Sequence, residues 1–239
     1  MTPRPHGNLL LRSLAPGDLR LLAPHLKRIS FGPGERVASP QEQLDQLLFP
    51  ESLLVTYHEP RIADDRAHVG MVGREGMVGW PLLLGGDRSS FLAIAQLQGG
   101  TALSIRKHIL LEACRISASL SPALLRYVHN FMMQLACTIV SNASDPIERR
   151  VVRWLLMMHD RTPEDVLPLT HDHVSSALNV RRASVTDCFH ILEGEGLLRC
   201  MRGRIAIRDR AGLQALAGDS YGMVEGHYAR DIGPFGRAA

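Results

Sequence analysis

The sequence predicts an α+β protein in which a β-rich N-terminal part, one long helix and a winged helix-turn-helix domain follow one another. Three observations predict this order. Short β-capable runs separated by glycine and proline occupy roughly residues 1–110. Residues 121–142 then form a long helical stretch whose single proline stands at its start. The last third of the chain combines a helix-turn-helix pattern with a basic hairpin.

Composition places the chain among globular proteins. It has 239 residues, of which 45% are apolar, and its formal net charge is +3. This mild charge permits an anionic partner without requiring one. We expect no signal peptide, because no charged start with an apolar run and a small-residue cleavage site is evident. The apolar runs are too short for a bilayer, and the four cysteines lack a C-x-x-C pair, so we expect a cytoplasmic protein with free thiols and no membrane contact.

The first 110 residues contain turn signals such as Gly32-Pro33-Gly34 and Gly85-Gly86-Asp87. Short strands at such close spacing are typical of a sandwich or barrel. A helical lead-in over residues 17–26 precedes them. The β-capable runs are "SFGPGERV", "LLVTYHE", "AHVGMVGREGMVGW", "FLAIAQLQ" and "GTALSI".

The long helix shows the pattern of a dimerisation seam. Ser121 is a good N-cap residue, and Pro122 suits the first helical position. Apolar residues recur in alternating steps of three and four, which is typical of a coiled coil. We therefore expect a parallel homodimer, although Leu124 and Phe131 leave open that the helix packs on its own β domain. The seam consists of Leu125, Val128, Met132, Leu135 and Ile139, with the polar Asn142 at its end.

A new helix is predicted after residue 145. Asp145 precedes Pro146, and Glu148 stands in the first turn, where the helix dipole favours an acid. The predicted division is therefore a β domain over residues 1–120, a dimerisation helix over 121–144, and a winged helix-turn-helix domain with a C-terminal helical extension over 145–239.

Within that last domain, Thr170 is the expected cap of a helix that has Asp172 in its first turn. The helix-turn-helix template requires a small residue in the first helix, a residue that tolerates positive φ at the corner, and a β-branched residue in the second helix. "LLRCMRGRIAI" then predicts a hairpin that turns near Arg202-Gly203, and hence a winged helix. The template positions are occupied by Ser175, Leu178, Asn179 and Val185.

The second helix begins with two arginines, Arg181 and Arg182. A helix N-terminus is already positive, so cations there indicate an anionic partner from outside the chain. In this motif the start of the second helix enters the major groove of double-stranded DNA. The alternative, an amphipathic helix whose arginines only face water, remains open. The expected DNA-facing side chains are Arg181, Arg182, Ser184, Thr186 and Asp187 on the helix, and Arg199, Arg202 and Arg204 on the wing.

The chain resembles the CRP/FNR superfamily of bacterial transcription regulators along nearly its whole length. The matching pieces, in order, are "FGPGERV", "VGREGMVGWPLLLGGDRSSFLAIAQ", the long helix, "DPIERRVVRWLLMMH" and "LTHDHVSSALNVRRASVTDCFHILEGEGLLRCMRGRIAIRD". The resemblance implies a jelly-roll sensor domain that resembles cyclic-nucleotide-binding domains, a dimerising helix and a two-fold symmetric operator. It leaves RNA polymerase open as a further partner.

The effector pocket that the resemblance implies departs from the family pattern. The family uses a Gly-Glu pair for the cyclic AMP ribose, followed by Arg-Ser or Arg-Thr for the phosphate. This sequence has Gly79-Trp80 in place of Gly-Glu, whereas Arg88-Ser89 retains the phosphate side. We therefore expect no response to cyclic AMP and leave the effector unknown. Arg88 has the alternative interpretation of an ordinary loop arginine.

The recognition helix departs as well. The family's best-known pattern has Arg-Glu and, four residues later, a second arginine; here Arg182, Ala183 and Asp187 occupy these positions. We expect an altered half-site. Asp187 either accepts a hydrogen bond from cytosine or orients Arg182, and we favour the second role.

Other classes of function are weaker. An iron–sulfur sensor needs a cysteine cluster, and residues 1–30 contain no cysteine. The pairs His171/His173 and Cys188/His190 are two residues apart, which directs their side chains away from each other, so no metal or cofactor is expected. Cys188 is either a packing residue or a redox switch. No enzyme motif is present, and a ligand sensor or scaffold that does not bind DNA remains the alternative. The operator, the sign of regulation and the signal stay open.

Overall fold

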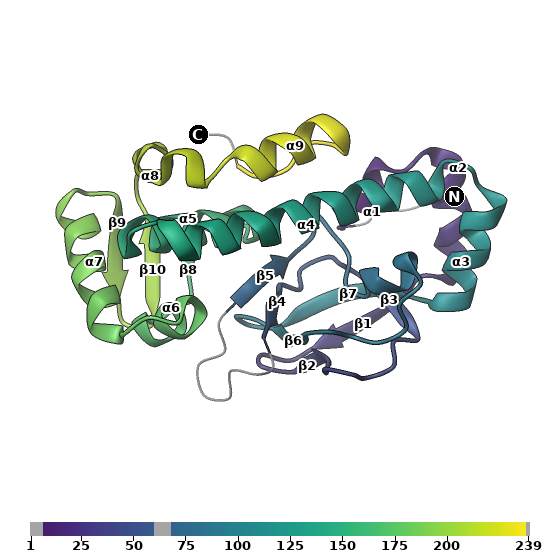
Figure 1. Cartoon of the computed structure of the whole chain (residues 1–239), viewed down its shortest axis with the longest axis horizontal. Coiled ribbons are helices and arrows are strands. Elements are labelled where there is room, and N and C mark those ends of the chain that lie inside the picture. Colours follow the sequence, from purple (N-terminus) through teal and green to yellow (C-terminus); the bar gives the residue numbers. More distant parts are fainter. Residues whose placement is uncertain (1–6, 60–67, 238–239) are drawn as a thin grey trace.

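The computed structural model describes residues 7–59 and 68–237. Residues 1–6, 60–67 and 238–239 of the predicted domains lie outside the described part, as does the first residue of the run "AHVGMVGREGMVGW". Figure 1 shows a β domain and a helical C-terminal domain that are joined by one long helix. The α+β class is confirmed, with a two-sheet β domain and a winged helix-turn-helix domain.

The β domain contains two antiparallel sheets with their apolar faces packed together. In one sheet, β7 (Gly100–Arg106) lies between β1 (Lys27–Phe31) and β3 (Gln46–Pro50). The order in the other is β2 (Arg36–Ala38), β6 (Leu92–Ala95), β4 (Val55–His58) and β5 (His68–Val72). Every member of β4 is buried, because this strand is covered on both faces.

The elements of the β domain differ from the prediction in three places: two helices and one strand were not predicted. The lead-in comprises α1 (Leu9–Ser13), α2 (Pro16–Leu22) and the short 3-10 helix η1 (Ala23–His25), and α1 was not predicted. Strand β3 was not predicted either, and α3 (Lys107–Ile116) begins where β structure was expected to continue. Helix α3 buries Leu110 and Ala113, which lie three residues apart on the side of the helix that faces the β domain.

The long helix α4 spans Leu120–Ser144. Its N-cap is Ser119 rather than the predicted Ser121, because Ser119 donates a hydrogen bond of 2.7 Å to the buried Asp18 of α2 and so fixes the chain two residues earlier. Pro122 still lies in the first turn, where its missing N–H leaves no intrahelical bond unmade.

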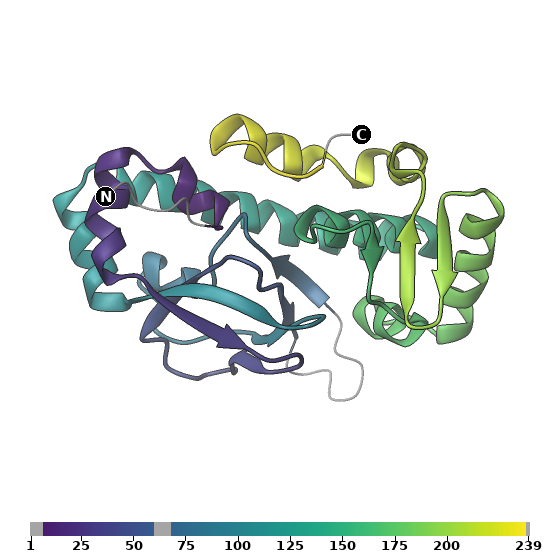
Figure 2. The same cartoon turned by 180° about the vertical axis from the view of Figure 1, so that it is seen from behind.

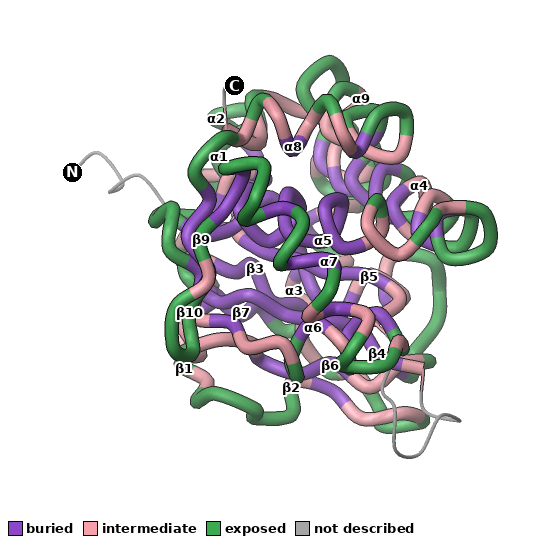
Figure 3. Tube along the Cα trace, turned by 90° about the vertical axis from the view of Figure 1, so that its left-hand side faces the viewer, coloured by how far each residue is buried: buried purple, intermediate pink, exposed green. Residues whose placement is uncertain are grey.

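Helix α4 has one buried and one exposed face, which Figure 3 shows close to end-on as a purple inner side and a green outer side. Val128 was predicted for the dimer seam, but it is 2% exposed within the core of its own β domain. Leu135 is half-buried against the same core. The outer face exposes four large apolar residues and two alanines, namely Leu125, Met132, Ala136, Ile139, Val140 and Ala143.

The C-terminal domain begins with α5 (Ile147–Arg161), which is buried along most of its length. Next come β8 (Val166–Leu167), α6 (His171–Leu178), α7 (Arg182–Gly194), β9 (Leu198–Met201), β10 (Arg204–Ile207) and α8 (Arg210–Ala217). The three strands form a sheet in the order β8-β10-β9, so the predicted hairpin is confirmed and gains a third strand.

The chain then returns to the β domain. The 3-10 helix η3 (Gly218–Ser220) leads into α9 (Met223–Asp231), which runs beside α4 on the side opposite the sheets (Figures 1 and 2). Across the described ranges, 7–59 and 68–237, no helix combines the length and hydropathy needed to span a bilayer.

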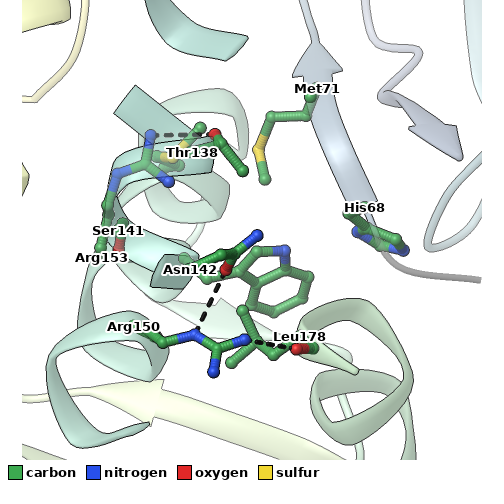
Figure 4. A pocket seen from close by; sticks show the side chains of 11 residues that line it. His68, Met71, Thr138, Ser141, Asn142, Arg150, Arg153 and Leu178 are labelled. Atoms are coloured by element: carbon green, nitrogen blue, oxygen red, sulfur yellow. Dashed lines mark hydrogen bonds between the residues drawn. The ribbon is translucent and has the colours of Figure 1, made fainter. Parts of the chain in front are cut away.

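The two domains meet around the end of α4, where a small cavity of about 20 Å³ is closed by side chains from both (Figure 4). Arg150 donates to the side chain of Asn142 on α4 and to the carbonyl of Leu178 on α6. His68 of β5 lies 5.9 Å, between ring centroids, from Trp154 of α5. The junction is therefore a packed interface between the domains.

We expect this interface to lose stability in acid. Burial first, and the nearby His58 second, hold the pKa of His68 well below its usual value of about 6.5. The unfolded chain takes up a proton below that value while the native ring does not, so the free energy of unfolding falls as pH decreases below about 6.5. Thermal unfolding at pH 7.5 and 5.5 checks this. His68→Gln should reduce the acid loss, whereas His25→Gln, at an exposed position of the β domain, is the control and should not.

Candidate nucleic-acid interface

The helix-turn-helix forms as the sequence predicts. The Thr170 hydroxyl caps α6 by accepting a hydrogen bond of 3.2 Å from the backbone N–H of His173. Asn179 turns the corner with φ 51° and ψ 53°, a left-handed conformation that asparagine tolerates. Val185 is fully buried between the two helices and Phe189 packs one turn later, so α7 is fixed on the core by its apolar face.

The opposite face of α7 presents polar and cationic groups to solvent. Arg181 is the N-cap residue and Arg182 the first residue of the helix, and both are exposed. Ser184 is half-buried and Asp187 is exposed. Two arginines at the positive end of a helix can be stabilised by an anion that binds there. The two arginines therefore lie at the start of α7, where the sequence places them.

Arg182 is held by a different acid from the one expected. Its Nε lies 3.2 Å from Oδ1 of Asp172, in the first turn of α6. The favoured role of Asp187, to orient Arg182, is thus filled by Asp172. Sequence reasoning placed Asp172 at a helix start for its dipole and missed this contact, because the two residues are ten positions apart and meet only once the turn at Asn179 is formed.

Thr186 also differs from the prediction. Its hydroxyl lies 3.0 Å from Nδ1 of His171, so the side chain is turned toward α6. Burial first, and the charge of Arg182 second, lower the pKa of His171. A neutral ring at neutral pH can accept the hydrogen bond from the Thr186 hydroxyl. Thr186 therefore holds the two helices together and does not point freely outward.

The wing carries three exposed arginines. Arg199 lies on β9, and Arg202 stands at the turn beside Gly203, whose φ of 71° suits the tight hairpin. Arg204 borders a cleft of about 690 Å³ that lies between residues 161–168 of the C-terminal domain and the loop of residues 96–100 of the β domain. Arg202 thus lies at the tip of the hairpin, whereas Arg204 borders a cleft that residues of the other domain also line.

The predicted effector pocket is largely filled. Trp80, on η2 (Trp80–Leu84), packs 5.9 Å from Phe131 of α4, and the remaining cavity beside Trp80, Ser89 and Tyr57 measures about 10 Å³. This space holds no more than a water molecule. An adjoining cavity that Gly79 also lines measures about 80 Å³, far below the roughly 300–1,000 Å³ of a typical ligand pocket. Gly79 has φ 92°, and a Cβ there would lie 2.9 Å from the Gln46 carbonyl oxygen, so glycine is required.

The arginine of the predicted pocket is directed elsewhere. Arg88 Nη1 donates to the Gln41 carbonyl oxygen at 2.7 Å, and Arg88 does not line the cavity. Ser89 is buried and donates to the Phe91 carbonyl oxygen. The ordinary loop role is therefore the one that the structure gives to Arg88.

The structure bears on two alternatives, a redox switch at Cys188 and a metal site. Cys188 is buried, and burial raises the pKa of its thiol to about 12. A thiol with so little thiolate is a poor redox switch, which favours the packing role. Within residues 7–59 and 68–237, no group of three or more His, Cys, Asp or Glu side chains is arranged to hold a metal ion.

Residues 149–216 match the family model of the Crp-like helix-turn-helix domain. The C-terminal domain is a Crp-like helix-turn-helix domain. The match begins in α5 and ends in α8, so it covers both helices of the motif and the wing. It confirms the predicted DNA-binding domain. No curated protein sequence matches the chain significantly.

Solved structures show the same fold over most of the chain. FixK2 from Bradyrhizobium japonicum has a TM-score of 0.70 at 16% identity, over 81% of this chain and 98% of its own. TTHB099, a CRP-family transcriptional regulator from Thermus thermophilus, has a TM-score of 0.66 at 20% identity, with 81% and 97% covered. The c-di-GMP-responsive global regulator CLP from Xanthomonas campestris has 0.63 at 17% identity, with 81% and 99% covered. The chain thus shares the overall fold of these structures, in which a β domain is joined to a helix-turn-helix domain.

Proposed function

We propose that this chain is a transcription regulator that binds a two-fold symmetric DNA operator as a homodimer in the cytoplasm, without responding to cyclic AMP and without catalytic activity. One observation supports the proposal most directly. The start of α7 exposes Arg181 and Arg182 while Val185 and Phe189 fix the other face of the helix on the core. A rigid helix with cationic and hydrogen-bonding groups at its free end fits the major groove.

The exposed face of α4 supports the homodimer. Leu125, Met132 and Ile139 recur every seven residues and are 37%, 53% and 69% exposed. Apolar side chains at this spacing, left uncovered on a long helix, fit the same face of a second copy. A symmetric pair of chains presents two recognition helices, and its operator then has matching two-fold symmetry.

A simple experiment separates this function from the alternative of a sensor or scaffold that does not bind DNA. The purified chain is applied to heparin and then mixed with labelled duplex in a gel shift. We expect late elution from heparin and a shifted duplex, because exposed arginines replace counterions along the phosphate backbone. Early elution together with no shift at low salt would contradict the proposal.

Cyclic AMP should not bind. Trp80 removes the acidic acceptor of the ribose hydroxyl that the family pattern provides, and only cavities of about 10 and 80 Å³ remain around Gly79. A buried ribose hydroxyl without its acceptor, and an adenine without room, both oppose binding. Isothermal calorimetry should show no binding heat up to millimolar cyclic AMP. A dissociation constant in the micromolar range would contradict the filled pocket.

Asp172 should determine how selectively Arg182 reads DNA. Asp172→Asn releases Arg182, so we expect the ratio of operator to scrambled-duplex affinity to fall about two- to fivefold, the range that an exposed ion pair supports. Asp219→Asn is the matched control, since it removes the same charge from an exposed position in η3, away from α7 and the wing. Binding titrations of both variants check this. If the ratio of operator to scrambled-duplex affinity were the same for the two variants, Asp172 would not orient Arg182 for base reading.

A further inference from the structure

Residues 218–237, here called the C-terminal segment, follow the part of the chain that matches the Crp-like domain. The segment consists of η3, α9 and the residues up to Arg237. It leaves the C-terminal domain after α8 and crosses back beside α4 (Figures 1 and 2). Its contacts therefore join parts of the molecule that are distant in sequence.

Three apolar side chains of the segment pack against the β domain. Tyr228 is 1% exposed and belongs to the hydrophobic core of the β domain, against which Ile232 and Phe235 also pack. The rings of Tyr228 and Phe235 lie 5.1 Å apart. Each buried aromatic side chain removes a large apolar area from water, so the segment is bound by the same force that holds the domain's own core.

Hydrogen bonds hold α9 against elements of the β domain and α4. The Tyr228 hydroxyl donates to the Glu75 carbonyl oxygen at 2.6 Å, in the turn after β5. Asn130 of α4 donates from Nδ2 to the Val224 carbonyl oxygen at 2.9 Å. Both contacts are buried, so water does not compete for them.

The start of the segment is tied to the α4–α5 connection. The Ser220 hydroxyl donates to Asp145 at 2.7 Å, and Arg153 of α5 donates from Nε to the Ser220 carbonyl oxygen at 2.9 Å. Arg153 also reaches Thr138 of α4 at 3.1 Å, as Figure 4 shows. The Arg153 guanidinium thus connects α4 and α5 to the segment near the connection between the two domains.

Beneath the segment lies an ion pair between the two domains. Nε of Arg161, at the end of α5, is 2.9 Å from Glu75 of the β domain, and the two side chains are 2% and 3% exposed. Phe235 covers this pair, with the Arg161 guanidinium carbon 5.1 Å from its ring centroid. A pair excluded from water in this way is held firmly, because separating it leaves two uncompensated charges.

The segment ends back on the C-terminal domain. Arg237 donates to the Thr162 carbonyl oxygen at 2.8 Å and pairs with Asp165. Its backbone N–H donates to Asp160, which also accepts from Arg210 of α8 at 2.6 Å. The segment is therefore fastened to the C-terminal domain at both ends and to the β domain in its middle.

We propose that the groove between α4, α5 and the turn after β5 is a binding surface for the chain's own C-terminal segment, which thereby holds the DNA-binding domain in one orientation relative to the β domain. The segment has the role that an effector has in a ligand-controlled regulator, although it binds at a different site from the pocket beside Trp80. It is a permanently attached ligand that fixes the arrangement of the domains. This agrees with the filled pocket beside Trp80, since a chain whose domain orientation is set internally needs no small molecule to set it.

The consequence for DNA rests on the proposed function. A two-fold operator is bound at both half-sites only when both DNA-binding domains are correctly oriented, and the apparent affinity falls in proportion to the oriented fraction. The segment holds the binding-competent orientation, so its loss lowers operator affinity.

The test uses the full-length dimer with spin labels on non-canonical residues at two exposed positions, Ser30 in β1 and Glu195 after α7. Labelled chains are diluted into unlabelled protein so that distances within one chain dominate. Variants are a truncation after Ala217, Tyr228→Phe combined with Phe235→Ala, and the control Met223→Ala, which changes a side chain on the exposed face of α9. Circular dichroism checks that each is folded, and operator affinity is titrated in parallel.

We expect one narrow distance distribution in the unaltered chain and in Met223→Ala, and broad distributions in the truncated and doubly substituted chains. Operator affinity should fall about tenfold in these two, as it does when about a tenth of the molecules stay oriented. Narrow distributions in both altered chains, or a rise in operator affinity on truncation, would overturn the proposal. If the unaltered chain binds no DNA, the proposed function fails, and the distance measurement still tests the segment.

Discussion

Replacing Met132 with glutamate is expected to convert the homodimer into monomers and to abolish high-affinity operator binding. Met132 is 53% exposed in the centre of the apolar face that Leu125 and Ile139 extend. In a symmetric dimer two such carboxylates would face each other in a water-excluded seam, and each uncompensated buried charge costs about 3–5 kcal/mol. A monomer contacts a single half-site and loses the contribution of the second.

Light scattering at micromolar concentration and an operator titration measure the two effects. Met223→Glu is the matched control: it introduces the same substitution at an equally exposed methionine on α9, away from the seam. It should leave dimer and operator affinity unchanged. Leu135 is a poorer site for the test, because it packs against the β domain and a charge there would damage the protomer itself. A monomeric unaltered chain, or a Met132→Glu variant that remains a dimer, would contradict the seam.

Replacing Arg182 with alanine is expected to relax base preference at one symmetric pair of operator positions. Arg182 is the first residue of α7 and is exposed at the end of the helix that the fold directs away from the core. A bidentate arginine contact to guanine discriminates against other bases by about 1–3 kcal/mol. Most of that discrimination should disappear at the affected pair, with smaller changes elsewhere.

The wing provides the comparison. Arg202→Ala should weaken operator and scrambled duplex alike and lower the salt slope by about one unit per subunit, as expected for a phosphate contact. Arg202 replaces the sequence-predicted Arg204 in this test because Arg204 borders the cleft beside the β domain. Titrations at several salt concentrations distinguish the two behaviours. Equal loss for both duplexes in Arg182→Ala would show that α7 is not the reading helix.

Local signals in the sequence predict the DNA-binding part of the fold well. Thr170, Asn179 and Val185 each meet a strict local requirement, for a cap, a left-handed corner and a buried β-branched residue, and all three are found in those roles. The start of α7 follows from the same pattern. These features depend on neighbours in sequence, so periodicity and turn chemistry detect them.

Contacts across the fold could not be predicted in this way. The Arg182–Asp172 and Thr186–His171 contacts depend on how α6 and α7 cross, which spacing alone does not specify. Val128 fitted a heptad as well as Met132 did, and only the position of the β domain decides which of the two faces is covered. An apolar helix face has the same pattern whether it meets its own domain or a partner.

The C-terminal segment gave a weak signal for the same reason. Tyr228 and Phe235 are isolated aromatics in a polar stretch, and their binding surface is assembled from α4, α5 and the turn after β5. Their sequence neighbours do not form this surface. A helical extension was therefore predicted, but its return to the β domain was not.

Selection of bound fragments from random duplex DNA by the purified chain, followed by sequencing, tests the central claim most directly. A homodimer with one α7 per protomer should enrich an inverted repeat whose half-sites are centred about 34–36 Å apart, one helical turn of DNA, with strong base preference in each half. A collection with no enriched motif, or with a single half-site that lacks a symmetric partner, would contradict a dimeric, sequence-specific regulator.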